Sequence, residues 1–208
     1  MTHKSIFAAS RMAVLAAAVT AATLLGACAP LLVGGAMVGT ALSMTDRRTS
    51  GAQLEDQAIE LKAINRVRGA AGGGANVSVT SYNRTVLVTG EVPTQAARAA
   101  AEQAVAGIEN VRATVNELAV MGSTTLAARS NDAILSSKVK AAFIDAKDLQ
   151  ANAFKVVAER GSIFLMGRVT EREGNRATEL ARATSGVGKV VKVFEILTEA
   201  ELAALQAK

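Results

Sequence analysis

"GSIFLMGRVTEREGNRATE", residues 161–179, repeats the pattern of "RTVLVTGEVPTQAARAAAE", residues 84–102. The alignment places Gly90 on Gly167 and Val92 on Val169, at an offset of 77 residues. The match extends upstream from "NVSVTSY" (76–82) to "FKVVAER" (154–160), and downstream from "GIENVRATVNEL" (107–118) to "GVGKVVKVFEIL" (186–197). An internal repeat of this length predicts two structural units of the same kind.

Hydrophobic spacing gives the order of elements in each unit. Each unit starts with apolar residues at i, i+4 and i+8, which is typical of a helix packed on a core. These residues are Ile59, Ala63 and Val67 in the first unit, and Leu135, Val139 and Phe143 in the second. Two alternating segments follow, and alternation indicates strands with one buried face. Turns near Asn83–Arg84 and Arg160–Gly161 would join them as tight hairpins, because Asn and Gly accept positive φ.

A second helix is expected in each unit, over 94–106 and 171–184, before the last strand. Pro93 and Thr94 in one unit, and Thr170 in the other, suit the cap and first turn of these helices. A helix between the second and third strands lets those strands run parallel through a right-handed crossover. We therefore predict an α+β fold of two tandem units, each αββαβ with a three-stranded mixed sheet packed against two helices.

The first 27 residues have the features of an export signal. Residues 1–11 contain Lys4 and Arg11 but no Asp or Glu. Residues 12–25 are apolar apart from two threonines, as in the hydrophobic region of a signal peptide. This apolar run is shorter than the ~20 residues that a membrane-spanning helix needs. We therefore expect a removable signal peptide rather than a membrane span.

Cys28, the single cysteine of the chain, ends this segment. Leu25, Gly26 and Ala27 before it resemble the lipobox of bacterial lipoproteins. The resemblance implies that the thiol receives a diacylglyceryl group, that the signal is cut before Cys28, and that the new amino terminus is acylated, typically with palmitate. Ala29 in place of Asp implies transfer to the outer membrane. The alternative is a soluble secreted protein with a cysteine at a cleavage site of the small-residue type.

The predicted boundaries follow from these features. They are a lipoprotein signal peptide at 1–27, an acylated tether at 28–50, the first domain at 51–119, a linker at 120–128, the second domain at 129–198 and a C-terminal tail at 199–208. The tether contains "PLLVGGAMVGTALSMT" (30–45), which has no charge but too many glycines for a good isolated helix.

The repeated unit resembles the BON domain. The resemblance rests on "LVTGEV" (87–92) and "FLMGRV" (164–169), in which a glycine closes the second strand, and on the "G(I/V)xxV" that precedes the last strand. Two such domains behind a lipobox resemble the arrangement of the dual-BON outer-membrane lipoproteins. The stretches "TDRR" (45–48) and "FLMGRVTERE" (164–173) resemble the sequences of that family. This implies a non-enzymatic protein, lipid-anchored at the periplasmic face of the outer membrane. It further implies binding of anionic phospholipid through the first helix of the second domain, a place at cell division sites, and a role in membrane integrity under envelope stress.

Charge distinguishes the two otherwise similar domains. Residues 51–118 contain six Lys or Arg and seven Asp or Glu, whereas residues 129–197 contain twelve and eight. Each basic residue near an anionic membrane contributes about 1 kcal/mol. An anionic lipid surface is therefore expected to attract the second domain.

The first helix of the second domain carries the predicted lipid site. When the core residues face the sheet, Ile134, Ala141 and Ile144 fall near the opposite side, at about 100° per residue. Lysines border this apolar strip on both flanks, as suits a helix lying at a headgroup interface. The predicted contacts with a phosphatidylglycerol-type or cardiolipin-type lipid are Ile134, Leu135, Lys138, Ala141 and Ile144.

Two features weigh against this lipid site. Ile134 would contact the other domain in the alternative interpretation, and Asp145 and Asp148 reduce the positive charge of the helix. The dual-BON family also carries an aromatic residue near the start of this helix, where the present chain has Ile134. A second function therefore stays open, that of an adaptor that binds other envelope proteins through a strand edge or the domain interface, without lipid selectivity.

Several other functions are disfavoured. His3 is the only histidine, and it would leave with the signal peptide, while Cys28 would be acylated. This excludes Ser/His/Asp and Cys/His catalysis and leaves no nitrogen or sulfur ligand for zinc, so no catalytic residue, metal or cofactor is expected.

"GAAGGGA" (69–75) lacks the Lys-Ser/Thr ending of a phosphate-binding loop. Modest charge and a single Tyr argue against nucleic acid. Gly90 and Gly167 are expected to be structural.

Overall fold

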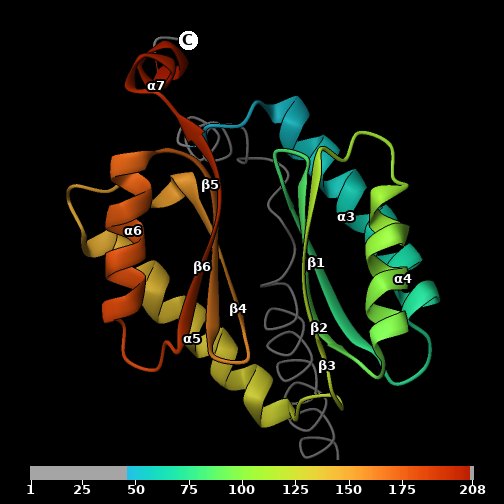
Figure 1. Ribbon diagram of the computed structural model, residues 1–208. Coiled ribbons are helices and arrows are strands. Elements are labelled where there is room, and N and C mark those ends of the chain that lie inside the picture. Colours follow the sequence, from blue (N-terminus) through green and yellow to red (C-terminus); the bar gives the residue numbers. More distant parts are fainter. Residues whose placement is uncertain (1–45, 207–208) are drawn as a thin grey trace, which may run out of the picture. The chain divides into compact units, whose positions relative to one another are not determined.

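The computed structural model describes residues 46–206, which form two αββαβ units (Figure 1). The first unit contains α3 (Ser50–Ala71), β1 (Asn76–Tyr82), β2 (Thr85–Val92), α4 (Gln95–Ala106) and β3 (Ala113–Val120). The second contains α5 (Leu126–Asp145), the short 3₁₀ helix η2 (Ala151–Ala153), β4 (Phe154–Glu159), β5 (Ser162–Thr170), α6 (Glu171–Ala183) and β6 (Lys189–Leu197). The predicted α+β class is confirmed. The predicted signal peptide and Cys28 lie outside the described residues.

Each sheet has the predicted mixed topology. β1 pairs antiparallel with β2, and β2 pairs parallel with β3. β4, β5 and β6 repeat this arrangement. The hairpin turns fall at Asn83–Arg84 and at Arg160–Gly161, and all four residues have positive φ, as two-residue turns of the type I′ class require.

Threonine caps begin the second helix of each unit, as the sequence predicts. The side chain of Thr94 accepts a hydrogen bond from the backbone N–H of Ala97 at the start of α4. At the start of α6, Thr170 and Glu173 form a reciprocal capping box, in which each side chain binds the backbone N–H of the other. These bonds satisfy helix N–H groups that have no partner within the helix.

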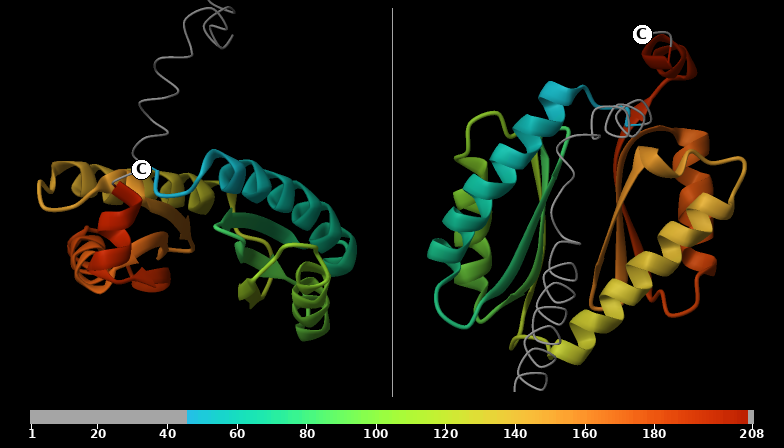
Figure 2. Two further views of the ribbon diagram at one scale, coloured as in Figure 1. Left: turned by 90° about the horizontal axis from the view of Figure 1, so that it is seen from above. Right: turned by 180° about the vertical axis from the view of Figure 1, so that it is seen from behind.

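The two helices of each unit cover one face of its sheet (Figures 1 and 2). Ile59, Ala63 and Val67 of α3 are fully buried there. In the second unit the ring of Phe154 meets the rings of Phe143 and Phe194 edge-on, with centroids 5.3 and 5.9 Å apart. Edge-to-face contacts of this kind add to the stability that apolar burial supplies.

The opposite faces of the two sheets share a smaller apolar cluster. Its buried members are Tyr82 and Leu87 from the first unit, and Phe164 and Met166 from the second. β2 and β5 are thus buried on both faces, which explains the uninterrupted apolar run of β5. The two domains therefore contact each other through the sheet faces that the helices leave uncovered.

Gly90 and Gly167 lie where a neighbouring strand or loop leaves no room for a side chain. A Cβ at Gly90 would overlap the backbone carbonyl of Asn76 on the neighbouring strand. A Cβ at Gly167 would lie 2.6 Å from the carbonyl oxygen of Ala153. Both positions thus require close backbone approach at the end of a strand.

The segment expected to be a C-terminal tail contains a helix, α7 (Glu199–Gln206). Thr198 and Glu201 exchange hydrogen bonds at its start, and Leu202 is buried. α5 likewise begins at Leu126, within the segment expected to be a linker. Between residues 46 and 206, no helix is both long and apolar enough to cross a membrane.

Candidate functional site: the outer face of helix α5

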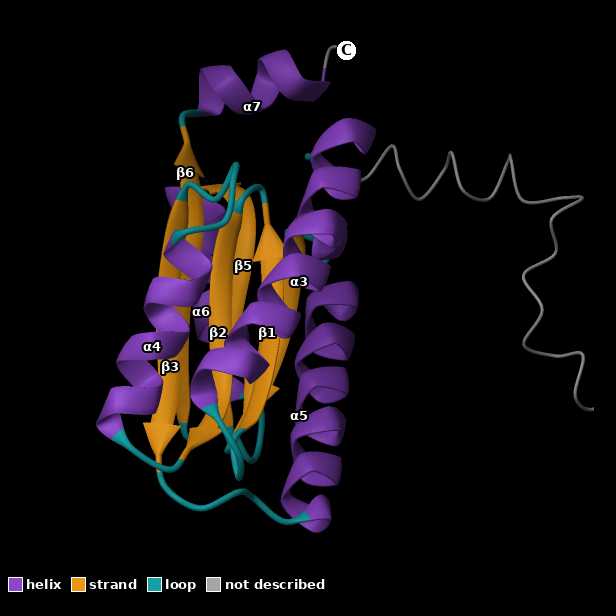
Figure 3. Ribbon diagram, turned by 90° about the vertical axis from the view of Figure 1, so that its right-hand side faces the viewer, coloured by secondary structure: helices purple, strands orange, loops and turns teal. Residues whose placement is uncertain are grey.

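α5 is one uninterrupted helix along the second sheet (Figure 3). The side chain of Thr125 caps its start by accepting from the N–H of Ala128 at 3.2 Å. Leu135, Val139 and Phe143 lie in the core, with no more than 6% of any of them exposed. The helical periodicity predicted from the sequence is therefore confirmed, and the opposite side of α5 is exposed.

Large apolar residues lie on that exposed side. Ile134 is 55% exposed, Ile144 is 72% exposed, and Lys138 and Ala141 are exposed with them. At about 100° per residue these four residues fall within one third of the helix circumference. We call them the α5 outer face. Leu126, which is 75% exposed at the first turn, extends the face. It is absent from the predicted site because residues 120–128 were expected to form a linker.

Leu135 differs from the other predicted lipid contacts. It is 6% exposed and belongs to the core of the second domain. Its remaining accessible atoms border a hollow beside α5. The structure thus brings four of the five predicted residues together on the surface and places the fifth beneath them.

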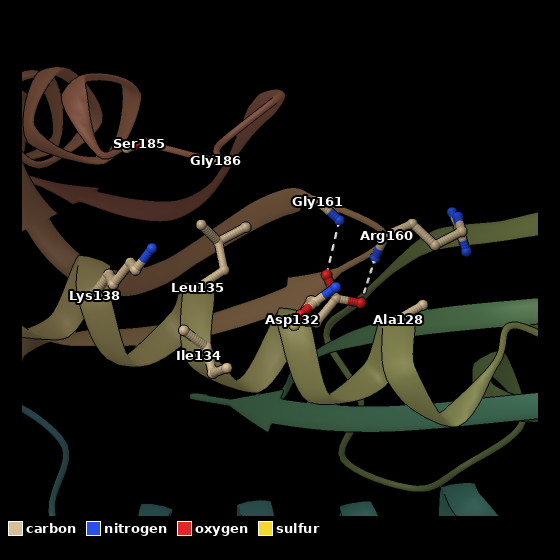
Figure 4. Close-up of a pocket in the computed structure, with 10 residues that line it drawn as sticks. Ala128, Asp132, Ile134, Leu135, Lys138, Arg160, Gly161, Ser185 and Gly186 are labelled. Atoms are coloured by element: carbon tan, nitrogen blue, oxygen red, sulfur yellow. Dashed lines mark hydrogen bonds between the residues drawn. The ribbon is translucent and has the colours of Figure 1, made fainter.

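The hollow has a volume of about 440 Å³ and is shown in Figure 4. α5 contributes Ile134 and Lys138, the β4–β5 turn contributes Arg160 and Gly161, and the loop before β6 contributes Gly186. The guanidinium of Arg160 is engaged elsewhere, because its Nη1 donates to the carbonyl oxygen of Gly90 at 2.7 Å. Lys138, in contrast, forms no ion pair within the described chain, so its charge is available at the mouth of the hollow.

Asp132 fixes α5 against the β4–β5 turn. Its two carboxylate oxygens accept hydrogen bonds of 2.8 Å from the backbone N–H groups of Arg160 and Gly161 (Figure 4). Asp56 of α3 does the same for the first domain, where it accepts from the N–H groups of Asn83 and Arg84. Each aspartate thus holds the first helix of its domain on a hairpin turn. The sequence carries a signal for this role, since each is a charged residue three positions before the first core residue of its helix.

Burial alone would raise the pKa of Asp56. The hydrogen bonds from the backbone of Arg84 and Asn83 and from the side chains of Ser81 and Arg48 outweigh it and hold that pKa below its usual value. Asp56 therefore stays ionised and bonded at neutral pH.

The charge that surrounds each helix differs between the domains. Lys138, Lys140 and Lys147 of the second domain are exposed and form no ion pair in the described part of the chain. α3 also exposes large apolar residues, Leu54 and Leu61, and the neighbouring Lys62 is exposed as well. The difference therefore lies in the charge of the whole domains, with six basic and seven acidic residues in 51–118 against twelve and eight in 129–197. An anionic surface would attract the second domain more strongly than the first.

The described residues contain no cluster of three or more His, Cys, Asp or Glu side chains that could hold a metal ion. Gly72 and Gly74 have positive φ in the connection between α3 and β1, so the glycine-rich stretch links a helix to a strand. A phosphate-binding loop would instead open a helix with these residues.

Comparison with known families defines the class of protein. The family model of the BON domain matches residues 55–122 and 131–198. The two matches coincide with the two αββαβ units of the structure. The molecule is therefore a tandem BON-domain protein.

Individual relatives narrow the class. The chain is 37% identical over 173 residues to the outer membrane lipoprotein DolP of Haemophilus influenzae, in an alignment that covers 82% of this chain and 89% of that protein. It is 31% identical over 151 residues to the 21 kDa hemolysin of Actinobacillus pleuropneumoniae, covering 72% and 78%. The chain belongs to the DolP-like family of outer-membrane lipoproteins with two BON domains.

Similarity to solved structures is weak. CdsD, a structural protein of the type III secretion system of Chlamydia trachomatis, has 10% sequence identity and a TM-score of 0.29, over 70% of this chain and 97% of that one. A match of this quality informs neither fold nor function.

Proposed function

We propose that this protein is anchored to the periplasmic face of the outer membrane through acylated Cys28 and binds anionic phospholipid through the α5 outer face. In this way it supports the integrity of the outer membrane, including at division sites. One observation carries the proposal. Ile134 and Ile144 are exposed on a helix whose neighbouring lysines have no carboxylate partner in the described chain.

The energetics of such contact are favourable. Full burial of an isoleucine side chain contributes about 1.5–3 kcal/mol, and partial burial in the headgroup region contributes a fraction of this. Each lysine near an anionic surface contributes about 1 kcal/mol. Together, two isoleucines and two or three lysines give a modest attraction that depends on lipid charge.

The fold makes α5 suitable for this contact. Its core face and Asp132 attach it to the sheet, so the helix does not have to fold when it binds. A preorganised helix loses little conformational freedom on binding, which leaves more of the contact energy as affinity.

Acyl chains at Cys28 would supply the first membrane attachment. A single chain gives only reversible binding, whereas two or more chains, or one chain with a basic patch, give stable anchoring. The α5 outer face would add selectivity for headgroup charge. Intact-mass measurement of the protein extracted from cells tests the anchor: we expect cleavage before Cys28 and added acyl mass, and an unmodified Cys28 would contradict it.

Vesicle flotation tests lipid selectivity. A form lacking residues 1–28 should float with phosphatidylglycerol vesicles more than with neutral phosphatidylcholine vesicles. Ile134→Asp should abolish this binding because it places a carboxylate at the centre of the apolar strip. Lys138→Glu should weaken it strongly, and raised salt should weaken it as well.

Leu61→Asp on α3 is the matched control. Leu61 is 66% exposed, so the substitution has the same chemistry on the corresponding helix of the first domain. We expect it to leave flotation unchanged. Equal binding to neutral vesicles, or no binding to either, would contradict the lipid proposal and favour the adaptor function.

A further inference from the structure

Arg47, close to the start of the described chain, is buried against the second domain. Its guanidinium donates two hydrogen bonds of 2.7 Å to the carboxylate oxygens of Glu173, in a bidentate pair. It also donates to the carbonyl oxygen of Arg168 at 2.9 Å and to Oε1 of Gln150 at 3.2 Å. Four hydrogen bonds thus attach this residue to α6, the end of β5 and the segment after α5.

Glu173 is ionised in this pair. Burial alone would raise its pKa, but the hydrogen bonds from Arg47 and from the backbone N–H of Thr170 outweigh burial and hold the pKa below its usual value. The pair therefore joins two full charges in a buried place, where removal of one partner leaves the other without compensation.

Arg48, the next residue, is attached to the first domain instead. Its Nη1 donates to Oδ2 of Asp56 at 2.8 Å. Its guanidinium lies over the ring of Tyr82, 4.2 Å from the ring centroid, in cation–π geometry. Asp46 accepts from Nη2 of Arg48 at 2.7 Å and so restrains the guanidinium. Burial raises the pKa of Tyr82 to about 12, so the ring under Arg48 is neutral.

Both carboxylate partners are fixed points of their own domains. Asp56 holds the β1–β2 turn through the backbone N–H groups of Asn83 and Arg84. Glu173 closes the capping box at the start of α6. Each arginine is therefore attached to a junction of rigid elements.

The covalent linker joins the domains at a different place. Thr124 of the linker donates its N–H to Glu91 at 3.2 Å, and Glu91 also accepts from the side chain of Asn76 at the start of β1. Arg48 lies at Tyr82, the last residue of β1. Since a strand of seven residues spans about 20 Å, the linker and Arg48 act at points separated by about that distance.

We propose that Asp46, Arg47 and Arg48 form an interdomain clasp, which fixes the second BON domain against the first at the end of their contact that the linker does not restrain. The clasp is independent of lipid binding, because none of its residues belongs to the α5 outer face. It makes the last residues of the predicted tether a part of the joint between the domains.

Distance measurement by double electron–electron resonance tests the clasp. Spin labels are attached to the full chain, purified in detergent with Cys28→Ser, at Ala99→Cys on α4 and Ala183→Cys on α6, both exposed positions. With the native clasp we expect one narrow distance distribution. With Arg47→Met combined with Glu173→Gln, or with Arg48→Ala, we expect that distribution to broaden and longer distances to appear.

The double substitution removes both buried charges together, and Gln retains the capping geometry at the start of α6. A second pair of labels, at Gln57→Cys and Ala99→Cys, lies within the first domain and reports whether that domain stays folded. Arg112→Ala is the matched control, because the pair of Arg112 with Glu195 also joins the domains but leaves the arginine side chain 57% exposed.

The proposal requires the interdomain distribution to broaden while the distribution within the first domain stays narrow. It also requires Arg112→Ala to have no such effect. A narrow interdomain distribution in the clasp variants, or one already broad with the native clasp, would overturn it. So would equal broadening in Arg112→Ala.

Discussion

At Gly90 the backbone has φ +113°, a conformation that residues with a side chain rarely adopt, and the space for a Cβ is taken by the carbonyl of Asn76. We expect Gly90→Ala to lower the free energy of unfolding by about 3 kcal/mol or more, since strain and overlap act together. Urea unfolding measures this loss.

Gly69 provides the control for that substitution. It lies in α3, and a Cβ there would meet nothing within 4 Å. Gly69→Ala should raise stability by up to about 1 kcal/mol, because alanine loses less conformational freedom than glycine in a helix. Equal losses at Gly90 and Gly69 would show that the close approach at β2 has no energetic role.

Glu159 is a buried carboxyl at the domain contact. Burial raises its pKa, and the negative charge of Glu91 raises it further. The folded protein thus favours the protonated form, and this contribution to stability is complete below the ordinary glutamate pKa of about 4.3 and is lost as pH rises through the higher folded value.

Glu159→Gln should therefore stabilise the protein at pH 7 and have little effect near pH 4. We expect a rise of a few degrees at most in the melting temperature at pH 7, because 1 kcal/mol corresponds to about 2–4 °C in a protein of this size. Calorimetric scans at the two pH values measure the difference. A gain of the same size at both would contradict the role of ionisation.

Single residues also show the limit of sequence reasoning. The turns at Asn83–Arg84 and Arg160–Gly161 were predictable for two reasons. Each lies between two alternating segments, and each contains Asn or Gly, which accept positive φ. The roles of Asp56 and Asp132 were not predicted, because a charged residue on a helix is expected to face solvent unless its partners are known. Their position, three residues before the first core residue of each helix, is visible in the sequence, but the backbone N–H groups of the turns that they bind carry no sequence signal.

At the scale of elements, the caps of the helices differ in burial. Thr170 is 2% exposed and forms a reciprocal capping box with Glu173. Thr125, which caps α5, only accepts a hydrogen bond from the backbone N–H of Ala128. We expect Thr170→Ala to lower the free energy of unfolding by about 1–2 kcal/mol, and Thr125→Ala by about 0.5–1 kcal/mol. Chemical denaturation of the two variants under one set of conditions makes the comparison. A larger loss at Thr125 would contradict the importance of the box.

The strands and the core faces of the helices were predictable because period 2 and period 3.6 are imposed by burial on one side. Element ends were less so. α5 begins at Leu126 rather than near residue 129, because the capping side chain of Thr125 is followed by residues without clear periodicity. α7 was missed for a similar reason, since eight residues give too few turns to show a pattern.

At the scale of the whole molecule, acid should weaken the fold through three carboxylates. Burial alone would raise the pKa values of Asp56, Glu91 and Glu173, but their hydrogen bonds outweigh burial and lower all three. The stability they contribute is present above the ordinary pKa values of about 4 and is lost as pH falls toward the lower folded values.

We therefore expect the free energy of unfolding to fall steadily from about pH 4.5 downward. Urea titrations between pH 7 and pH 3 measure this fall. Glu91→Gln should lower stability at pH 7 and make it less sensitive to acid. Stability that is independent of pH over this range would contradict the assignment.

The contact between the domains was the least predictable part of the molecule. The apolar run of β5, residues 163–166, is buried on both faces, and such a run indicates a strand covered on both sides. It does not say what covers the second face. That information lies in the pairing of Tyr82 and Leu87 with Phe164 and Met166, which depends on packing between repeats.

The bonds between Arg47 and Glu173 join residues that are 126 positions apart in the chain. By contrast, Asp56 meets its turn at separations of 27 and 28 positions. Because a chain emerges amino terminus first, Arg47 appears well before its partner. During that interval the first domain can complete its own hydrogen bonds with Asp56, while the two ends of the clasp do not yet coexist. We therefore expect the domain contact to close after the first domain has folded, and until then Arg47 and the apolar face of β2 would be exposed to other chains.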